Sequence, residues 1–287
     1  MIPEELRRHR LTIDLIPDAL RLSEEPGWNQ VAADWCWMIE HGDSFGFSTS
    51  DGQLVASGLT VRFNGTFAWI SMILVTEAYR RRGLATRLMQ SCIEVLHQQN
   101  LVPALDASPE GRQVYLPLGF RDVYRTTRLF APQPPTINAP SPAKVAIAPM
   151  GETSLQSILT YDRAVSGTDR SELLRHLFGR CKGAAAIACR EGRICGFVLA
   201  RDGRRCAQIG PLAADDPETA LVLLQRALAA IDGPVCLDVG DHHLQMRAWL
   251  DANGFIPVTP FIRMIEGRAE PFDDPRRVYV IAGPELG

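Results

Sequence analysis

Residues 75–86, which read Val-Thr-Glu-Ala-Tyr-Arg-Arg-Arg-Gly-Leu-Ala-Thr, connect an apolar stretch to an amphipathic one. Residues 66–75 are strand-like, and the apolar side chains of residues 83–98 recur at helical spacing. A helix start presents unpaired N–H groups and the positive end of the helix dipole, which together attract a pyrophosphate. Gly83 would let a phosphate approach the backbone closely. The segment therefore predicts a phosphate-binding strand–loop–helix; an ordinary connection with a solvated arginine cluster is the alternative.

The segment resembles the acetyl-CoA signature of the GNAT N-acetyltransferase superfamily, Arg/Gln-x-x-Gly-x-Gly/Ala, through Arg80, Gly83 and Ala85. The preceding valine and aromatic residue of that family are matched by Val75 and Tyr79. The resemblance implies that three strand residues pair with the pantetheine arm and that the loop after them holds the pyrophosphate. The residues so assigned to the cosubstrate acetyl-CoA are Ile73, Leu74, Val75, Arg80, Arg81, Arg82, Gly83, Leu84, Ala85 and Thr86.

A second element, residues 115–120, reads Tyr-Leu-Pro-Leu-Gly-Phe and resembles the Tyr-x-x-x-Gly-Phe of the same family. The resemblance implies that Tyr115 lies near the acyl sulfur and protonates the departing thiolate, a role that suits a phenol. A tyrosine that packs on the core is the alternative. Pro117 departs from the Lys or Arg that is common there. No general base is evident: Glu40, His41 and Asp43 are candidates, and a water relay is the default.

The length of 287 residues favours two domains. Five prolines between residues 131 and 144 indicate an extended linker, so the first domain is predicted at 1–130 and the second at 145–287. The second half repeats the order of elements, and residues 234–238 and 250–255 match residues 103–106 and 115–120. The expected fold class is α+β: two tandem GNAT-like domains, each a mixed, mostly antiparallel sheet flanked by helices. A first strand is expected at residues 10–16 and a helix at residues 28–41.

The second half is predicted to be a degenerate copy. Its equivalent loop lacks the signature and carries Asp215, Asp216 and Glu218, whose charges oppose a phosphate, and Leu250 replaces the tyrosine. Residues 161–172 resemble a segment of certain bacterial two-domain acetyltransferases, and so do residues 27–29. This resemblance implies that the second domain either walls the acceptor pocket or is structural. The residues expected to contact the acceptor are Asn29, Asp162 and Asp169. Helix capping and pairing with an arginine are the alternatives for the two aspartates.

The composition narrows the classes of partner. The net charge of −3 gives no basis for binding nucleic acid or a membrane. Seven cysteines without a Cys-x-x-Cys pair indicate reduced thiols and no metal site. No signal peptide is evident and no apolar run approaches a membrane span, so a cytoplasmic location is expected. The oligomeric state cannot be read from the sequence.

These observations predict an N-acetyltransferase that moves the acetyl group of acetyl-CoA to a primary amine of a small molecule by direct attack. Two alternatives stay open. The first is a non-catalytic acyl-CoA sensor or scaffold, which the lack of an evident base favours. The second is a protein N-acetyltransferase, which would need an open acidic groove for a peptide.

Overall fold

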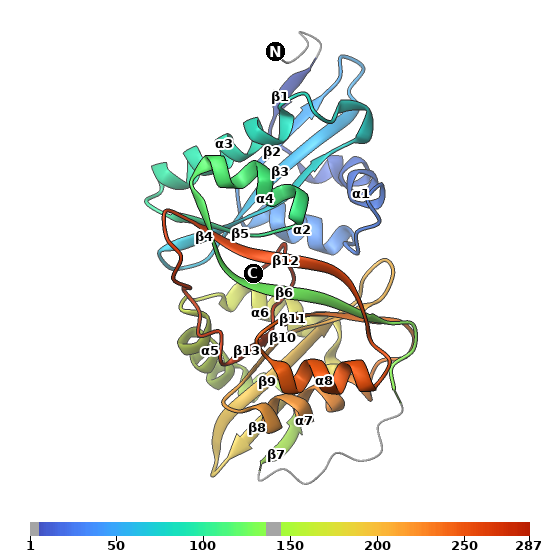
Figure 1. Ribbon diagram of the computed structural model, residues 1–287, viewed down its shortest axis with the longest axis vertical. Helices are drawn as coiled ribbons and strands as arrows, with labels where there is room; N and C mark the ends of the chain where they lie inside the picture. Colours follow the sequence, from blue (N-terminus) through green and yellow to red (C-terminus); the bar gives the residue numbers. More distant parts are fainter. Residues whose placement is uncertain (1–5, 136–144) are drawn as a thin grey trace.

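The computed structural model describes residues 6–135 and 145–287 of the chain, shown in Figure 1. In the first half, two helices precede a meander of strands, and two further helices flank the fifth strand. The elements are β1 (Arg7–His9), α1 (Ile16–Glu24), α2 (Ala32–Glu40), β2 (Ser44–Ser48), β3 (Leu54–Arg62), β4 (Phe67–Val75), α3 (Leu84–Gln98), β5 (Val102–Ala107), α4 (Pro109–Tyr115) and β6 (Phe120–Ala131).

The second half repeats this order and adds one short strand. Its elements are β7 (Ala146–Pro149), α5 (Glu152–Ser166), α6 (Ser171–Arg180), β8 (Ala186–Arg190), β9 (Arg193–Arg201), β10 (Ala207–Ala214), α7 (Pro217–Leu228), β11 (Val235–Gly240), α8 (Leu244–Ala252), β12 (Ile256–Glu266) and the added β13 (Val278–Val280). The mostly antiparallel sheet with flanking helices confirms the expected fold class.

The two halves do not build separate sheets, contrary to the expectation from the sequence. All the strands form one sheet in the order β1-β2-β3-β4-β5-β12-β6-β11-β13-β10-β9-β8-β7. The last long strand of each half is exchanged: β12 pairs with β5 of the first half, and β6 pairs with β11 of the second. Figure 1 shows β6 and β12 side by side across the middle of the molecule.

A pair of equivalent ion pairs holds the exchanged strands. On β12, Arg263 lies opposite Asp106 of β5 and donates to both of its carboxylate oxygens, at 3.1 and 3.0 Å. On β6, Arg128 lies opposite Asp238 of β11 and does the same at 2.8 and 2.8 Å. Burial raises the pKa of the Asp106 carboxyl, and the Arg263 guanidinium opposes that rise. The repeated pair indicates that these charges secure the exchange in both halves.

Several boundaries differ from those expected. The strand expected at residues 10–16 is wrong: β1 ends at His9, and Ile13–Leu15 form a 3₁₀ turn. The helix expected to start at residue 28 starts at Ala32, because the backbone of Val31 is extended. The predicted linker overlaps the end of β6, which includes Ala131. The remainder of that prediction falls largely on residues 136–144, which lie outside the described residues.

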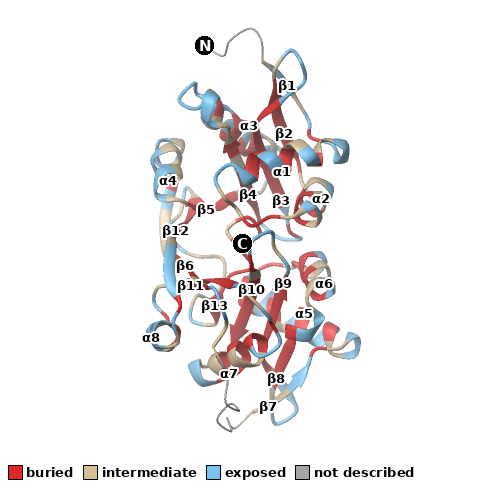
Figure 2. Ribbon diagram, turned by 90° about the vertical axis from the view of Figure 1, so that its right-hand side faces the viewer, coloured by how far each residue is buried: buried red, intermediate tan, exposed pale blue. Residues whose placement is uncertain are grey.

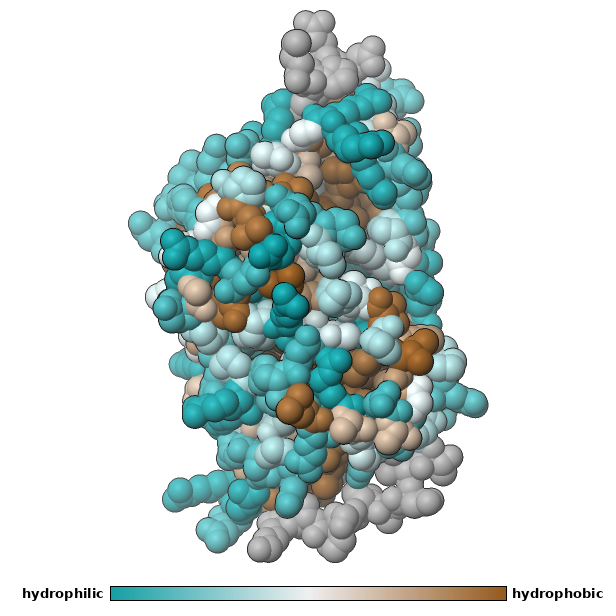
Figure 3. All heavy atoms as spheres, in the orientation of Figure 1, coloured by the Kyte–Doolittle hydropathy of each residue, from teal (hydrophilic) through white to brown (hydrophobic). Residues whose placement is uncertain are grey.

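The core is continuous between the halves. Its largest cluster combines Trp35, Trp69 and Met72 with Phe197 and Ile281. Figure 2 shows buried strands from the top to the bottom of the sheet. On the face seen in Figure 3, apolar and polar side chains are interspersed. The exposed large apolar side chains include Leu244 of α8 and Ile256 and Val258 of β12. None of the described helices is long and apolar enough to cross a membrane.

A buried histidine beside β13 predicts a pH-dependent stability. The ring of His243 bonds to the carbonyl oxygen of Val278 at 2.8 Å and stacks on Tyr279 at 4.0 Å. Burial lowers its pKa to about 4. The unfolded imidazole titrates near pH 6.5, so this contribution to stability is complete above that pH and is lost as the pH falls towards the folded value.

We therefore expect His243 to account for a loss of about 2 kcal/mol of unfolding free energy between about pH 7.5 and pH 5. Urea unfolding at the two pH values measures this loss. His243→Gln should lose correspondingly less stability over the same interval. An unchanged pH dependence in His243→Gln would contradict the assignment.

Candidate active site

The first half contains an open slot between two parallel strands. Strands β4 and β5 pair only through three residues each, and the last pair is Trp69 with Ala104. Beyond it the strands separate. Met72, at φ 53°, lies where the pairing of β4 with β3 shifts register. A Cβ at Gly58 of β3 would lie 2.8 Å from Ile73 Cδ1 and 3.2 Å from Leu88 Cβ, so β3 approaches β4 and α3 closely there. The bulge and the separation leave the end of β4 without a neighbouring strand on its β5 side among residues 6–135 and 145–287.

Polar backbone groups of β4 face this slot. The amide of Thr76 donates to Val55 of β3 at 3.0 Å, so the neighbouring Val75 directs its N–H and C=O away from β3. At the outer end, Arg80 Nε donates to the Val75 carbonyl oxygen at 3.1 Å. The guanidinium of Arg80 also lies 3.5 Å from Glu25. The slot therefore offers an amide donor inside and a guanidinium at its mouth.

The loop after β4 ends at an uncapped helix start. Gly83 precedes α3 with φ 79°, and Arg81 has φ 58°, two left-handed positions that turn the chain sharply. No side chain caps α3, and its first turn holds no acidic residue. Arg82 lies 4.7 Å over the Tyr79 ring and donates to Ala78. Among the described residues, the Arg81 side chain has no hydrogen bond or ion pair. This loop thus combines free N–H groups with an available guanidinium.

Tyr115 lies on the α3 side of the sheet, in the same apolar cluster as Ile73 and Val75. Helix α4, which carries it, starts at the Ser108 side chain, which accepts a hydrogen bond from Gly111. The Tyr115 hydroxyl would lie 3.2 Å from a Cβ at Gly111, so its ring folds back over its own helix. Burial raises the pKa of the phenol, which keeps it a proton donor. Pro117 lies in a 3₁₀ turn after α4 and does not interrupt the helix.

The equivalent slot of the second half is filled by the chain itself. Strands β10 and β11 also pair through three residues and then separate. Strand β13 lies between them, where Val280 pairs with both Leu212 and Val239. At the start of α7, the Asp216 side chain accepts a hydrogen bond from the Thr219 amide at 2.9 Å. Both features that remain open in the first half are thus occupied in the second.

The three predicted acceptor contacts serve structural roles. The Asn29 amide donates to the Cys206 carbonyl and accepts from two backbone amides of the same loop, which ties the halves together. Asp162 is buried and accepts two hydrogen bonds from Arg170, both 2.9 Å long. Asp169 accepts from the Ser171 amide at the start of α6. Capping and arginine pairing, the alternatives for the aspartates, are therefore what the geometry shows.

The candidate bases lie away from the slot. His41 bonds to the Trp37 carbonyl oxygen and stacks on the Trp37 ring at 4.5 Å. Asp43 is buried and pairs with Arg10 at the β2 end of the sheet. Glu40 is exposed at the end of α2. None of the three is brought to the space between β4 and β5.

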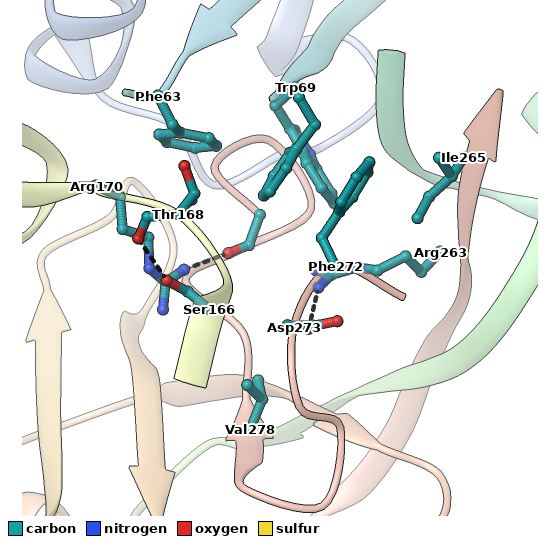
Figure 4. A pocket seen from close by; sticks show the side chains of 12 residues that line it. Phe63, Trp69, Ser166, Thr168, Arg170, Arg263, Ile265, Phe272, Asp273 and Val278 are labelled. Carbon is teal, nitrogen blue, oxygen red and sulfur yellow. Dashed lines mark hydrogen bonds and ion pairs between the residues drawn. The ribbon is translucent and has the colours of Figure 1, made fainter. Parts of the chain in front are cut away.

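A narrow crevice between the halves instead lies beside the closed end of the slot (Figure 4). The first half contributes Phe63, Phe67 and Trp69, and the second contributes residues from four stretches of the chain. The charged lining side chains are Arg170, Arg263 and Asp273. Arg170 belongs to residues 161–172, which the sequence analysis expected to wall the acceptor pocket, whereas Arg263 and Asp273 were not singled out from the sequence. An arginine within the apolar strand at residues 255–265 was the available signal for Arg263. Among the described residues, no group of His, Cys, Asp and Glu could hold a metal ion.

Comparison with known proteins agrees with this geometry in both halves. Residues 11–120 match the model of the acetyltransferase (GNAT) family, and residues 158–280 match that of an acetyltransferase (GNAT) domain. The chain belongs to the GNAT acetyltransferases. It is 24% identical over 241 residues to the uncharacterised N-acetyltransferase YitH of Bacillus subtilis, covering 82% of this chain and 83% of YitH.

Solved structures resemble this GNAT protein along its length. One from Pyrococcus horikoshii has a TM-score of 0.79 at 22% identity and covers 100% of this chain and 98% of its own. A tandem GNAT protein from the clavulanic acid biosynthesis pathway has a TM-score of 0.64 at 14% identity, with 92% and 99% covered. At these identities the likeness establishes the shared fold.

Proposed function

We propose that this GNAT protein transfers the acetyl group of acetyl-CoA to a primary amine of a small molecule, and that only the first half binds the cosubstrate. The observation that carries the proposal is the open slot beside β4, which leads to the uncapped start of α3. The second half provides the internal comparison, because there β13 and Asp216 occupy the same positions.

The residues of the slot fit the parts of the cosubstrate. Acetyl-CoA would supply the activated thioester. The edge formed by Ile73, Leu74 and Val75 would pair with the pantetheine arm as an added strand does, through the backbone groups that face the slot, such as those of Val75. The N–H groups of Leu84, Ala85 and Thr86, with the Arg81 guanidinium, would hold the pyrophosphate. The Val75 amide, directed into the slot, would donate to the oxyanion of the tetrahedral intermediate.

The acceptor amine has a pKa of about 10 and is therefore protonated at neutral pH, so it must lose a proton before it attacks. The carboxylate of Asp106 on β5 is close to the slot, but Arg263 occupies both of its oxygens. Because Asp238 and Arg128 form the same pair in the half that lacks a slot, a structural role accounts for Asp106. We therefore propose that water carries the proton away. Tyr115 then protonates the departing thiolate.

Tyr115→Phe tests this last step. Because a thiolate leaves comparatively easily without a proton, the loss should lie at or below the low end for general acid catalysis, and we expect kcat to fall roughly ten- to hundredfold. Phenylalanine keeps the apolar packing of the ring, so CoA affinity and thermal stability should stay close to those of the wild type. Steady-state kinetics and calorimetric titration with CoA measure these quantities. A wild-type kcat in Tyr115→Phe would contradict the role of Tyr115.

The whole proposal is tested by calorimetric binding of CoA together with thiol release from acetyl-CoA in the presence of a panel of amines. Binding with amine-dependent thiol release is expected. CoA binding without release for any amine would favour the sensor. Release with lysine peptides alone would favour a protein N-acetyltransferase. The second half covers the acceptor side of β4, which supports a small acceptor.

A further inference from the structure

The crevice between the halves has the chemistry of a cation site. Its cavity volume is about 30 Å³, which is room for roughly two water molecules. That space suits the head of a ligand, whose remainder would extend through the partly open mouth. Its apolar walls include Phe63 and Phe67 of the first half and Phe272 of the second, with the Phe67 and Phe272 rings stacked at 4.1 Å. Apolar walls strengthen any charge interaction inside.

Both guanidinium groups in the lining already pair with buried carboxylates. Arg170 donates to Asp162 through Nε and Nη2 and to the Gly287 carbonyl oxygen through Nη1, at 2.7 Å. Arg263 donates to Asp106 through Nε and Nη2 and to Asp273 through Nη1, at 2.8 Å. Each guanidinium thus holds a buried carboxylate through Nε and Nη2 and a further oxygen acceptor through Nη1. A carboxylate or a phosphate in the crevice would have to compete with these acceptors.

Acceptors, by contrast, remain available. Both donors to Asp273, Arg263 and the Tyr124 hydroxyl, bond to its Oδ2 atom. Among the described residues, no donor is assigned to Asp273 Oδ1. The hydroxyl of Thr168 is buried in the same lining and has no hydrogen-bond partner in the described part of the chain. Figure 4 shows Asp273 and Thr168 on different sides of the crevice. Two carboxylates balance the two guanidiniums, so Asp273 leaves the site with one excess negative charge.

We propose that this crevice binds a protonated amino group of the acceptor, and that this group is not the one acetylated. A carboxylate stabilises an ammonium in its charged form, whereas attack on the thioester needs the neutral amine. The acceptor would then carry a second amino group at the slot. From Trp69 at the crevice to Met72 at the bulge is roughly 10 Å along the strand. The inference rests on the proposed function and specifies its substrate class: an alkyl diamine.

Calorimetric titration of the full-length protein with hexamethylenediamine and with hexane-1,6-diol, which has the same length but no ammonium, tests the site without turnover. We expect the diamine to bind at least tenfold more tightly than the diol. Asp273→Asn, which keeps the shape and removes the charge, should bring the two affinities within about twofold. Tyr124→Phe removes one donor to Asp273 but keeps its charge, so it should retain the preference. Equal binding by the wild type, or a preference that survives Asp273→Asn, would overturn the inference.

Thr168→Val supplies a second variant that should fold, because replacing an unpartnered buried hydroxyl costs little or stabilises. Its preference for the diamine should fall about threefold, and an unaltered preference counts against the hydroxyl as part of the site. Thiol release is measured separately. A diamine that binds with the expected preference but is not acetylated supports the ammonium site and contradicts the proposed function. If a monoamine is acetylated as readily as the diamine, the result supports the proposed function and contradicts the ammonium site.

Discussion

Ala85→Glu is expected to weaken CoA binding at least a hundredfold, about 2.7 kcal/mol, without lowering thermal stability. Ala85 is the second residue of α3, at a helix start with no acidic residue in its first turn. A carboxylate there would repel the pyrophosphate and at the same time interact favourably with the helix dipole. The second half already has this arrangement, with Asp216 as the cap of α7 and Glu218 in its first turn.

The matched control is Ala85→Gln, which adds nearly the same bulk without the charge. Calorimetric titration with CoA at low and high salt compares the two variants. The difference between them should shrink as salt screens the added carboxylate. Equal losses in both variants would mean that crowding alone, and not the phosphate charge, governs this position. Unchanged binding in Ala85→Glu would remove the pyrophosphate from the start of α3.

The start of α3 could be predicted from the sequence because it depends on neighbouring residues. Gly83 lies just before α3 and Ala85 lies in its first turn. The capping of α7 by Asp216 follows from an equally local pattern, since a carboxylate just before a helix caps it wherever the helix packs. What such local patterns specify is the start of a helix and the charge beside it.

The exchange of β6 and β12 could not be predicted, because a strand pattern fixes the face that is buried but not the neighbour. Arg263 pairs with Asp106, which lies 157 positions away in the chain. A charged residue within an apolar strand indicates that it has a buried partner of opposite charge. The sequence does not show which residue that partner is. The hydrogen bond from Asn29 to Cys206 of the other half could not be predicted for the same reason. The crevice between the halves is built from such long-range contacts.

The largest loss of stability is expected for Arg201→Met. Arg201 of β9 is buried between Asp34 of α2, 2.6 Å from its Nη1, and Glu285. Burial alone would raise the pKa of both carboxyls, but the guanidinium outweighs it and holds both pKa values below their usual range. Methionine fills much of the space and leaves Glu285 without its ion pair. Breaking a buried pair from one side costs about 3–5 kcal/mol.

Urea unfolding measures this loss, with Arg21→Met as the control. Arg21 pairs with Asp18 on the exposed face of α1, and such pairs contribute about 0–1 kcal/mol.

The pH dependence of the stability loss separates lost charge from lost packing. Because the folded pKa values of Asp34 and Glu285 are depressed, the stability they add is present above their unfolded values near 3.8 and 4.5 and is lost as the pH falls. The gap between wild type and Arg201→Met should therefore narrow below about pH 4. A gap that is independent of pH would assign the loss to packing, and a loss no larger than that of Arg21→Met would mean that this buried network does not hold the halves together.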